Sequence, residues 1–169
     1  DLTWDERSRA LADQLMSELK TELGQALQQG GAVAAITVCK SRAPEIAARL
    51  SASSGAEVKR TAIRLRNPAN APDDLERAVM QGFAAELSGA SPVASVPPEA
   101  IFESRSAQGT ERRYLRAIVM QPVCLACHGT TLAPDIATAI AREYPQDAAT
   151  GFETGQLRGA VTVRWPATR

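Results

Sequence analysis

The stretch AIFESRSAQGTERRYLRAIVM, residues 100–120, indicates how this chain folds. AIFES (100–104) and RRYLRAIVM (112–120) are typical of two strands, and SAQGTE (106–111) joins them. A short connection of this kind, with a glycine in it, suits a hairpin. We therefore expect antiparallel pairing at the centre of the fold.

Two helices are expected before these strands. Over residues 1–29 leucine recurs every fourth position with charges between, at Leu11, Leu15, Leu19, Leu23 and Leu27. Two glycines at 30–31 end that helix. The next helix carries an apolar stripe formed by Ile36, Cys39, Ala43, Ile46 and Leu50. Pro44 predicts a kink or a fresh start near Ser41, and SASSG (51–55) predicts a loop.

The remaining segments complete an α+β pattern. EVKRTAIRLRNP (57–68) predicts a strand with Ile63 and Leu65 on one face, and 67–72 a connector. A helix is expected from Asp73 or Asp74 to Leu87, with an inward side formed by Leu75, Val79, Phe83 and Leu87. A loop over 88–98, a helix over 135–145 and a strand over 156–165 follow. This order favours an antiparallel sheet flanked by helices, with a long N-terminal helix (1–29) before the main domain (30–169).

Composition limits the function classes. A chain of 169 residues suits one domain with a real core. Basic and acidic residues balance at 19 each, so nucleic acid is not an expected partner. No apolar run is long enough to predict a transmembrane helix. The chain begins at Asp1 without an initiator Met, as expected of a processed chain.

PVCLACHG (122–129) contains the strongest chemical signal and the only histidine. Two thiols separated by two residues can bond both vinyl groups of one haem, and the next residue can become an iron ligand. Cys124, Cys127 and His128 are therefore expected to hold one covalent haem c. Haem would also supply the large apolar body that a core with two Trp, two Tyr and three Phe lacks.

Other chemistries compete for this segment. Three cysteines and one histidine are a Cys3His zinc set, but adjacent Cys127 and His128 are poorly suited to one tetrahedral centre. A thioredoxin-like dithiol normally follows an early strand, and an iron–sulfur cluster normally needs four cysteines. A structural disulfide is the simplest alternative. The spacing favours haem over all of these.

Further residues are candidates for contacts with haem. Its propionates need cations, for which Arg60, Arg64, Arg66 and Arg158 are candidates, although any one of them could equally lie on a solvated surface. No second histidine can complete the iron coordination. The candidates are an open site or one of Cys39, Met16, Met80 and Met120. Met120 is close to Cys124 in sequence and would struggle to reach the opposite haem face, and a buried Met or Cys is often core filler.

Four segments together resemble a known family: AITVCKSRAPEIAARLS (35–51), RTAIRLRNPANAPDD (60–74), PVCLACHG (122–129) and YPQDAATGFETGQLRGAVTVRW (144–165). They are similar to bacterial single-haem c-type proteins with a PAS-like fold. Members occur as free periplasmic proteins and as sensor domains of histidine kinases and chemoreceptors. The resemblance implies covalent haem at Cys124 and Cys127, with His128 and Cys39 as the two axial ligands.

Three functions follow as hypotheses. A periplasmic redox or diatomic-gas sensor, for NO or CO, suits thiolate ligation, because a thiolate stabilises ferric iron and can be lost on protonation or reduction. A low-potential electron-transfer cytochrome is the alternative. Enzymatic chemistry has little support, since no spare histidine could serve an open distal site. The redox or signalling partner is not identified, and the leucine stripe of 11–27 could pair two copies or simply cover its own sheet.

Overall fold

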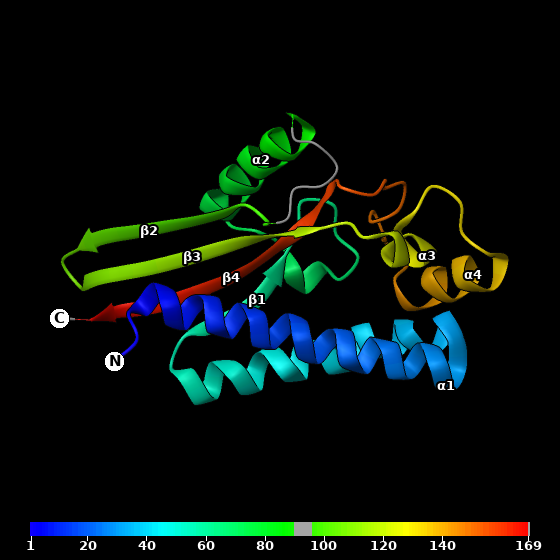
Figure 1. Ribbon diagram of the computed structural model, residues 1–169, viewed down its shortest axis with the longest axis horizontal. Helices are drawn as coiled ribbons and strands as arrows, with labels where there is room; N and C mark the ends of the chain where they lie inside the picture. Colours follow the sequence, from blue (N-terminus) through cyan, green and yellow to red (C-terminus); the bar gives the residue numbers. More distant parts are fainter. Residues whose placement is uncertain (90–95, 169) are drawn as a thin grey trace.

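The computed structural model describes residues 1–89 and 96–168. Most of the loop expected over 88–98 lies outside these residues. α1 (Trp4–Ser54) is a helical hairpin, because Gly31 interrupts the helix with φ 70° and ψ −167° (Figure 1). Only glycine adopts these angles readily. The turn expected at 30–31 is therefore confirmed. The division of the chain into an N-terminal helix (1–29) and a main domain (30–169) stays a prediction.

The second arm of the hairpin is longer than expected. Its backbone angles stay helical through Ser41 and Pro44, so a fresh start near Ser41 was wrong, while a kink at Pro44 stays a prediction. Pro44 and Lys40 are both exposed, so the carbonyl that Pro44 leaves without a partner faces solvent. The loop expected over 51–55 was also wrong, because the helix runs to Ser54 and ends at Gly55 with φ 77°.

Four antiparallel strands form one sheet in the order β1-β4-β3-β2. The central hairpin joins β2 (Glu99–Ser106) to β3 (Gly109–Val119), and β4 (Leu157–Thr168) pairs with β3 and with β1 (Glu57–Thr61). The hairpin and the final strand are confirmed. The α+β fold expected from the sequence, an antiparallel sheet flanked by helices after a long N-terminal helix, is the observed one.

β1 is shorter than expected, since the predicted strand continued through Ile63 and Leu65. After Thr61 the chain leaves the sheet, and the Thr61 hydroxyl donates to the carbonyl of Asn70 at 3.0 Å. Gly159 on β4 permits this departure, because a Cβ there would lie 2.4 Å from the Thr61 carbonyl oxygen. Ile63 is consequently 39% exposed.

The two faces of the sheet have different covers. The α1 hairpin packs on one face, where Leu15, Ile46 and Leu50 meet Tyr114 and Val163. The leucine stripe is thus largely used within its own chain, and Leu27 is the member that is 37% exposed. This favours the interpretation that the stripe covers its own sheet over pairing of two copies.

α2 (Asp74–Gly89) covers the opposite face. Met80 and Phe83 pack against Leu115 and Ala160 there. Of the four side chains expected to point inward, Phe83 is buried, while Leu75, Val79 and Leu87 are half-buried. The helix is confirmed, and its buried side is centred about one residue away from the expected stripe.

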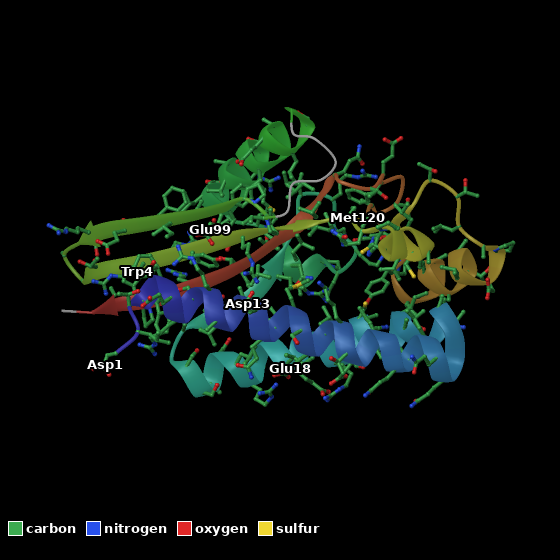
Figure 2. All side chains as sticks on the ribbon, in the orientation of Figure 1. Asp1, Trp4, Asp13, Glu18, Glu99 and Met120 are labelled. Atoms are coloured by element: carbon green, nitrogen blue, oxygen red, sulfur yellow. The ribbon has the colours of Figure 1, made fainter. Side chains whose placement is uncertain are left out.

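Polar contacts attach the first arm of α1 to the sheet. Arg9 pairs with Glu99 at 2.7 Å, and the buried Tyr114 hydroxyl donates to the same carboxylate at 2.8 Å. Arg116 pairs with Asp13 at 2.7 Å; Asp13 and Glu99 are labelled in Figure 2. The hydrogen bonds from Arg9 and Tyr114 lower the pKa of Glu99, so the contact is charged at neutral pH.

Candidate functional site

The CLACH segment directly follows the central strand. From the end of β3 the chain passes through a 3-10 turn, η2 (Pro122–Cys124), into one turn of helix, α3 (Leu125–His128). Cys124 and Cys127 are three residues apart in this helical geometry and therefore lie on the same side. Gly129 ends the turn where a Cβ would meet the Leu125 carbonyl oxygen at 2.6 Å, so no other residue fits there without a shift.

His128 is oriented by a backbone carbonyl. Its Nδ1 lies 2.7 Å from the oxygen of Ala149, and since a carbonyl only accepts, Nδ1 carries the proton. Nε2 is then the nitrogen with a free lone pair. Burial, together with the positive charges of Arg158 and Arg66, lowers the pKa of His128 to about 3. The ring is therefore neutral at physiological pH and is a donor for a metal.

A loop before β4 holds the histidine from one side. Gly151 and Phe152 donate their N–H groups to the carbonyls of Gly129 (2.8 Å) and His128 (2.9 Å). The Phe152 ring meets the His128 ring edge-on, with centroids 6.3 Å apart. These contacts give the segment 147–152 the role of a backbone cradle for CLACH.

Cys39 lies on the second arm of α1, on the side of CLACH. Ile36, one turn earlier, packs with α4 (Pro134–Glu143) in a cluster that Cys127 also contacts. Burial raises the pKa of the Cys39 thiol, and the charges of Arg60, Arg66 and Arg158 oppose that rise. A charge on Cys124 raises it further, so the sulfurs are within electrostatic reach of one another. All three cysteines are free thiols.

The four predicted arginines gather near this site but have different partners. Arg64 donates to the carbonyls of Ala148 and Thr150 and lies 4.0 Å above the Phe152 ring. Arg66 is buried and donates to several groups of the same loop. Both are therefore engaged with the protein's own backbone.

Arg60 and Arg158 are less fully engaged. Within residues 1–89 and 96–168 neither forms an ion pair, and Arg158 donates to the carbonyl of Arg64 at 3.0 Å. Burial, with the charges of Arg66 and Arg60, lowers the pKa of Arg158 to about 10. Asp147 pairs with Arg66 at 2.8 Å. The surplus of positive charge suits an anionic group bound here.

The methionines are separated by the fold. Met80 is buried under α2 on the far face of the sheet, and Met16 packs in the core between α1 and the sheet. Met120 is buried beside Cys124 and Phe152, at the junction of β3 and α3 (Figure 2). Of the three, Met120 is the one whose cluster includes a CLACH residue.

A cleft of about 650 Å³ lies next to this site. Met120, Phe152, Arg64 and Arg158 form part of its wall, together with the end of α2. Cys39 and the CLACH cysteines do not line it. The cleft therefore adjoins the predicted haem residues without containing them.

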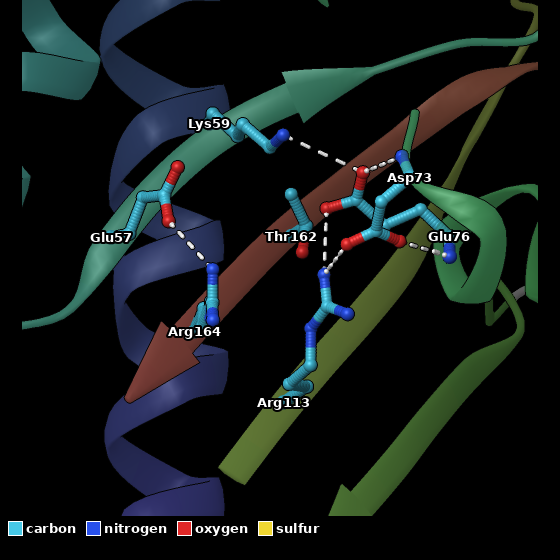
Figure 3. A pocket seen from close by; sticks show the side chains of 7 residues that line it. All are labelled: Glu57, Lys59, Asp73, Glu76, Arg113, Thr162 and Arg164. Carbon is cyan, nitrogen blue, oxygen red and sulfur yellow. Dashed lines mark hydrogen bonds and ion pairs between the residues drawn. The ribbon is translucent and has the colours of Figure 1, made fainter. Parts of the chain in front are cut away.

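A second polar cluster was not foreseen from the sequence. In Figure 3, Arg113 reaches Asp73 (2.6 Å) and the fully buried Glu76 (3.1 Å), and Lys59 lies 3.5 Å from Glu76. The Thr162 hydroxyl is buried there with no hydrogen-bond partner among the described residues. The enclosed volume of about 40 Å³ has room for water. The cluster could have been predicted in part from the sequence, because side chains alternate between the two faces of a sheet and this places Lys59, Arg113 and Thr162 on one face.

The positions of the cysteines and of His128 give no support to the zinc site considered from the sequence. Among the residues the structure describes, no three His, Cys, Asp or Glu side chains converge as a metal-ion site. The four sulfur and imidazole donors are instead divided between α1 and the CLACH turn. Over the same residues, none of the helices is both apolar and long enough to cross a membrane.

Fold and site together define a class: an α+β protein in which a CxxCH turn follows a central strand and packs near a helical hairpin that carries a cysteine. The sequence model of the Tll0287-like family matches residues 3–166, and the chain belongs to that family. The crystal structure of the cyanobacterial heme-protein Tll0287 is similar over 99% of both chains, with a TM-score of 0.66 and 25% sequence identity. No curated protein sequence matches significantly.

Proposed function

We propose that this chain is a mono-haem c protein that acts as a redox or diatomic-gas sensor. The observation that carries the proposal is the orientation of His128, which leaves Nε2 free in the turn that carries Cys127, with the Cys39 thiol within electrostatic reach of Cys124. The similarity to a structure described as a heme-protein supports the same cofactor. Free thiols and a neutral imidazole fit covalent haem better than they fit a structural metal.

Each residue then has a distinct task. Cys124 and Cys127 form the thioether bonds, His128 binds iron through Nε2, and Cys39 supplies the opposite ligand. Arg60 and Arg158 pair with the propionates, because neither forms an ion pair among the described residues, whereas Arg66 pairs with Asp147 and Arg64 binds two backbone carbonyls. The haem iron supplies reversible one-electron chemistry and a binding position for NO or CO.

The sensor role is supported by the surroundings of Cys39. Burial opposes a negative charge on its sulfur, whereas three arginines favour it. A ligand held by such a balance is easily lost when the iron is reduced, which would open a position for a gas. Binding and signalling, with no catalytic reaction, are accordingly what we propose.

A low-potential electron-transfer cytochrome is the second candidate. Val123, which directly precedes the CxxCH motif, is 69% exposed, so a redox partner could approach closely there. We also propose a periplasmic location, since haem c is attached outside the cytoplasmic membrane in bacteria. The redox or signalling partner is not identified by these residues.

Extraction in acid acetone tests the cofactor. Covalent haem c stays with the protein, and a pyridine haemochrome spectrum of the precipitate should give one haem per chain. Colour that extracts into the solvent, or zinc in place of iron, would contradict the proposal. A ligand change on reduction, followed by ferric and ferrous absorption spectra, separates sensor from carrier.

A further inference from the structure

Arg66 makes an unusually dense set of contacts for a side chain that is 8% exposed. Its Nε donates to Asp147 Oδ1 at 2.8 Å, and its Nη2 donates to the carbonyls of Cys127 (2.7 Å) and Ala149 (3.2 Å). One planar guanidinium therefore joins the CLACH turn to the loop before β4. Its charge is neutralised by the carboxylate of Asp147, whose side chain is 10% exposed.

The carbonyl of Ala149 is the point where these contacts meet the histidine. It accepts from His128 Nδ1 at 2.7 Å and from Arg66 at 3.2 Å. The N–H of the same residue donates to Asp147 Oδ1 at 3.2 Å. Both polar groups of Ala149 are thus held by the Arg66–Asp147 pair.

We propose that Arg66 and Asp147 are positioning residues, which fix the Ala149 carbonyl against Nδ1–H and so set the strength of His128 as an iron ligand. This rests on the proposed ligation of haem by His128. A firmly held acceptor at Nδ1 keeps the ring in one tautomer and raises the donor strength of Nε2. A stronger donor stabilises ferric iron more than ferrous iron, so it lowers the potential.

The substitution Arg66→Lys distinguishes the hydrogen-bond geometry of the guanidinium from its positive charge. Lysine keeps the positive charge but lacks the planar fork that reaches Asp147 and two carbonyls at once. In the holoprotein, proton NMR in D2O follows exchange of the His128 Nδ1–H, and a redox titration follows the potential. We expect exchange at least about tenfold faster than in the wild type, and a potential shifted upward.

Arg64→Lys is the matched control. Arg64 lies two residues away and binds the carbonyls of Ala148 and Thr150, on either side of Ala149. The substitution Arg64→Lys replaces a guanidinium by an ammonium next to the same loop, but it removes no hydrogen bond to the Ala149 carbonyl. Its Nδ1–H exchange should stay within about twofold of wild type.

Asp147→Asn keeps the inference testable if Arg66→Lys does not fold. The amide oxygen can still accept from Arg66, but the charge is gone, so exchange should lie between wild type and Arg66→Lys. Pyridine haemochrome is recorded first for every sample. Wild-type protein without haem would refute the proposed function and this inference together. Haem-loaded Arg66→Lys and Asp147→Asn with wild-type exchange and potential would refute the positioning role alone.

Discussion

Cys39 shows how one side chain is controlled by opposing effects. Burial among apolar groups raises the pKa of its thiol, while three arginines from β1, the segment after it and β4 favour the thiolate. A buried thiol without such neighbours would be an inert core residue. At the scale of one residue, burial and charge act in opposite directions on the thiol of Cys39, the residue that we propose as the partner of His128.

Replacing Cys39 by alanine should remove an anionic donor that stabilises ferric iron. We expect the potential to rise by about 100 mV or more, which is ~2.3 kcal/mol for a one-electron couple. The ferric haem should become high-spin or recruit water, and CO or NO should bind faster. Absorption spectra and a redox titration measure both effects.

Met16→Leu is the control for this change, because Met16 packs between α1 and the sheet and should leave the spectrum unaltered. If Cys39→Ala leaves spectrum, spin state and potential as they were, the cysteine is core filler. An open coordination position would then be the next alternative, tested by the rate of CO binding.

At the scale of elements, the α1 hairpin brings Cys39 to CLACH. Its two arms are tied together by ion pairs such as Arg42 with Glu22 at 2.8 Å, and both arms reach the sheet. The reversal depends on one residue, Gly31, whose positive φ and extended ψ exclude a side chain.

Gly31→Ala should therefore destabilise the fold by about 1–3 kcal/mol, the typical cost of strained backbone angles. Gly24→Ala is the matched control, because Gly24 is in the first arm and a Cβ there meets nothing within 4 Å. That change should stabilise the protein by about 0.5–1 kcal/mol through better helix propensity. Urea unfolding followed by circular dichroism measures both, and equal stabilities of the two variants would argue against the hairpin turn.

For the whole molecule, haem is expected to complete the core. Two small clusters flank CLACH: Cys127 joins the one around Ile136 and Ile140, and Cys124 joins the one around Met120 and Phe152. The cysteines and His128 are half-buried between them. Apolar packing around CLACH is thus divided between two small clusters, which a haem bound there would join.

Cys124→Ala combined with Cys127→Ala should prevent attachment and yield little folded protein. Val123→Ala, at the exposed position between Pro122 and Cys124, should leave haem content and melting unchanged. Near-UV circular dichroism and thermal melting report the outcome. A double variant with native-like spectra and melting would show that the core is complete without haem.

The local features of this protein were readable from its sequence. The hairpin over 100–120, α2 and the turn at 30–31 follow from patterns that span a few neighbouring residues, as does the CxxCH motif on which the proposed haem attachment rests. Such patterns succeed where backbone propensity and apolar period agree. They failed over 51–55, where the helix continues to Ser54, and after Thr61, where the chain leaves the sheet and the Thr61 hydroxyl donates to the carbonyl of Asn70.

The roles of the charged side chains followed from long-range contacts. Arg64 and Arg66 look alike in sequence, yet they bind alternate carbonyls of a loop about 80 residues away, and Arg66 alone reaches Cys127. Glu76 and Arg113 likewise form a buried pair that no local pattern marks. The partner of a long polar side chain is selected by which backbone and charges the fold brings within about 3 Å of it, and neighbours in sequence carry no record of that distance.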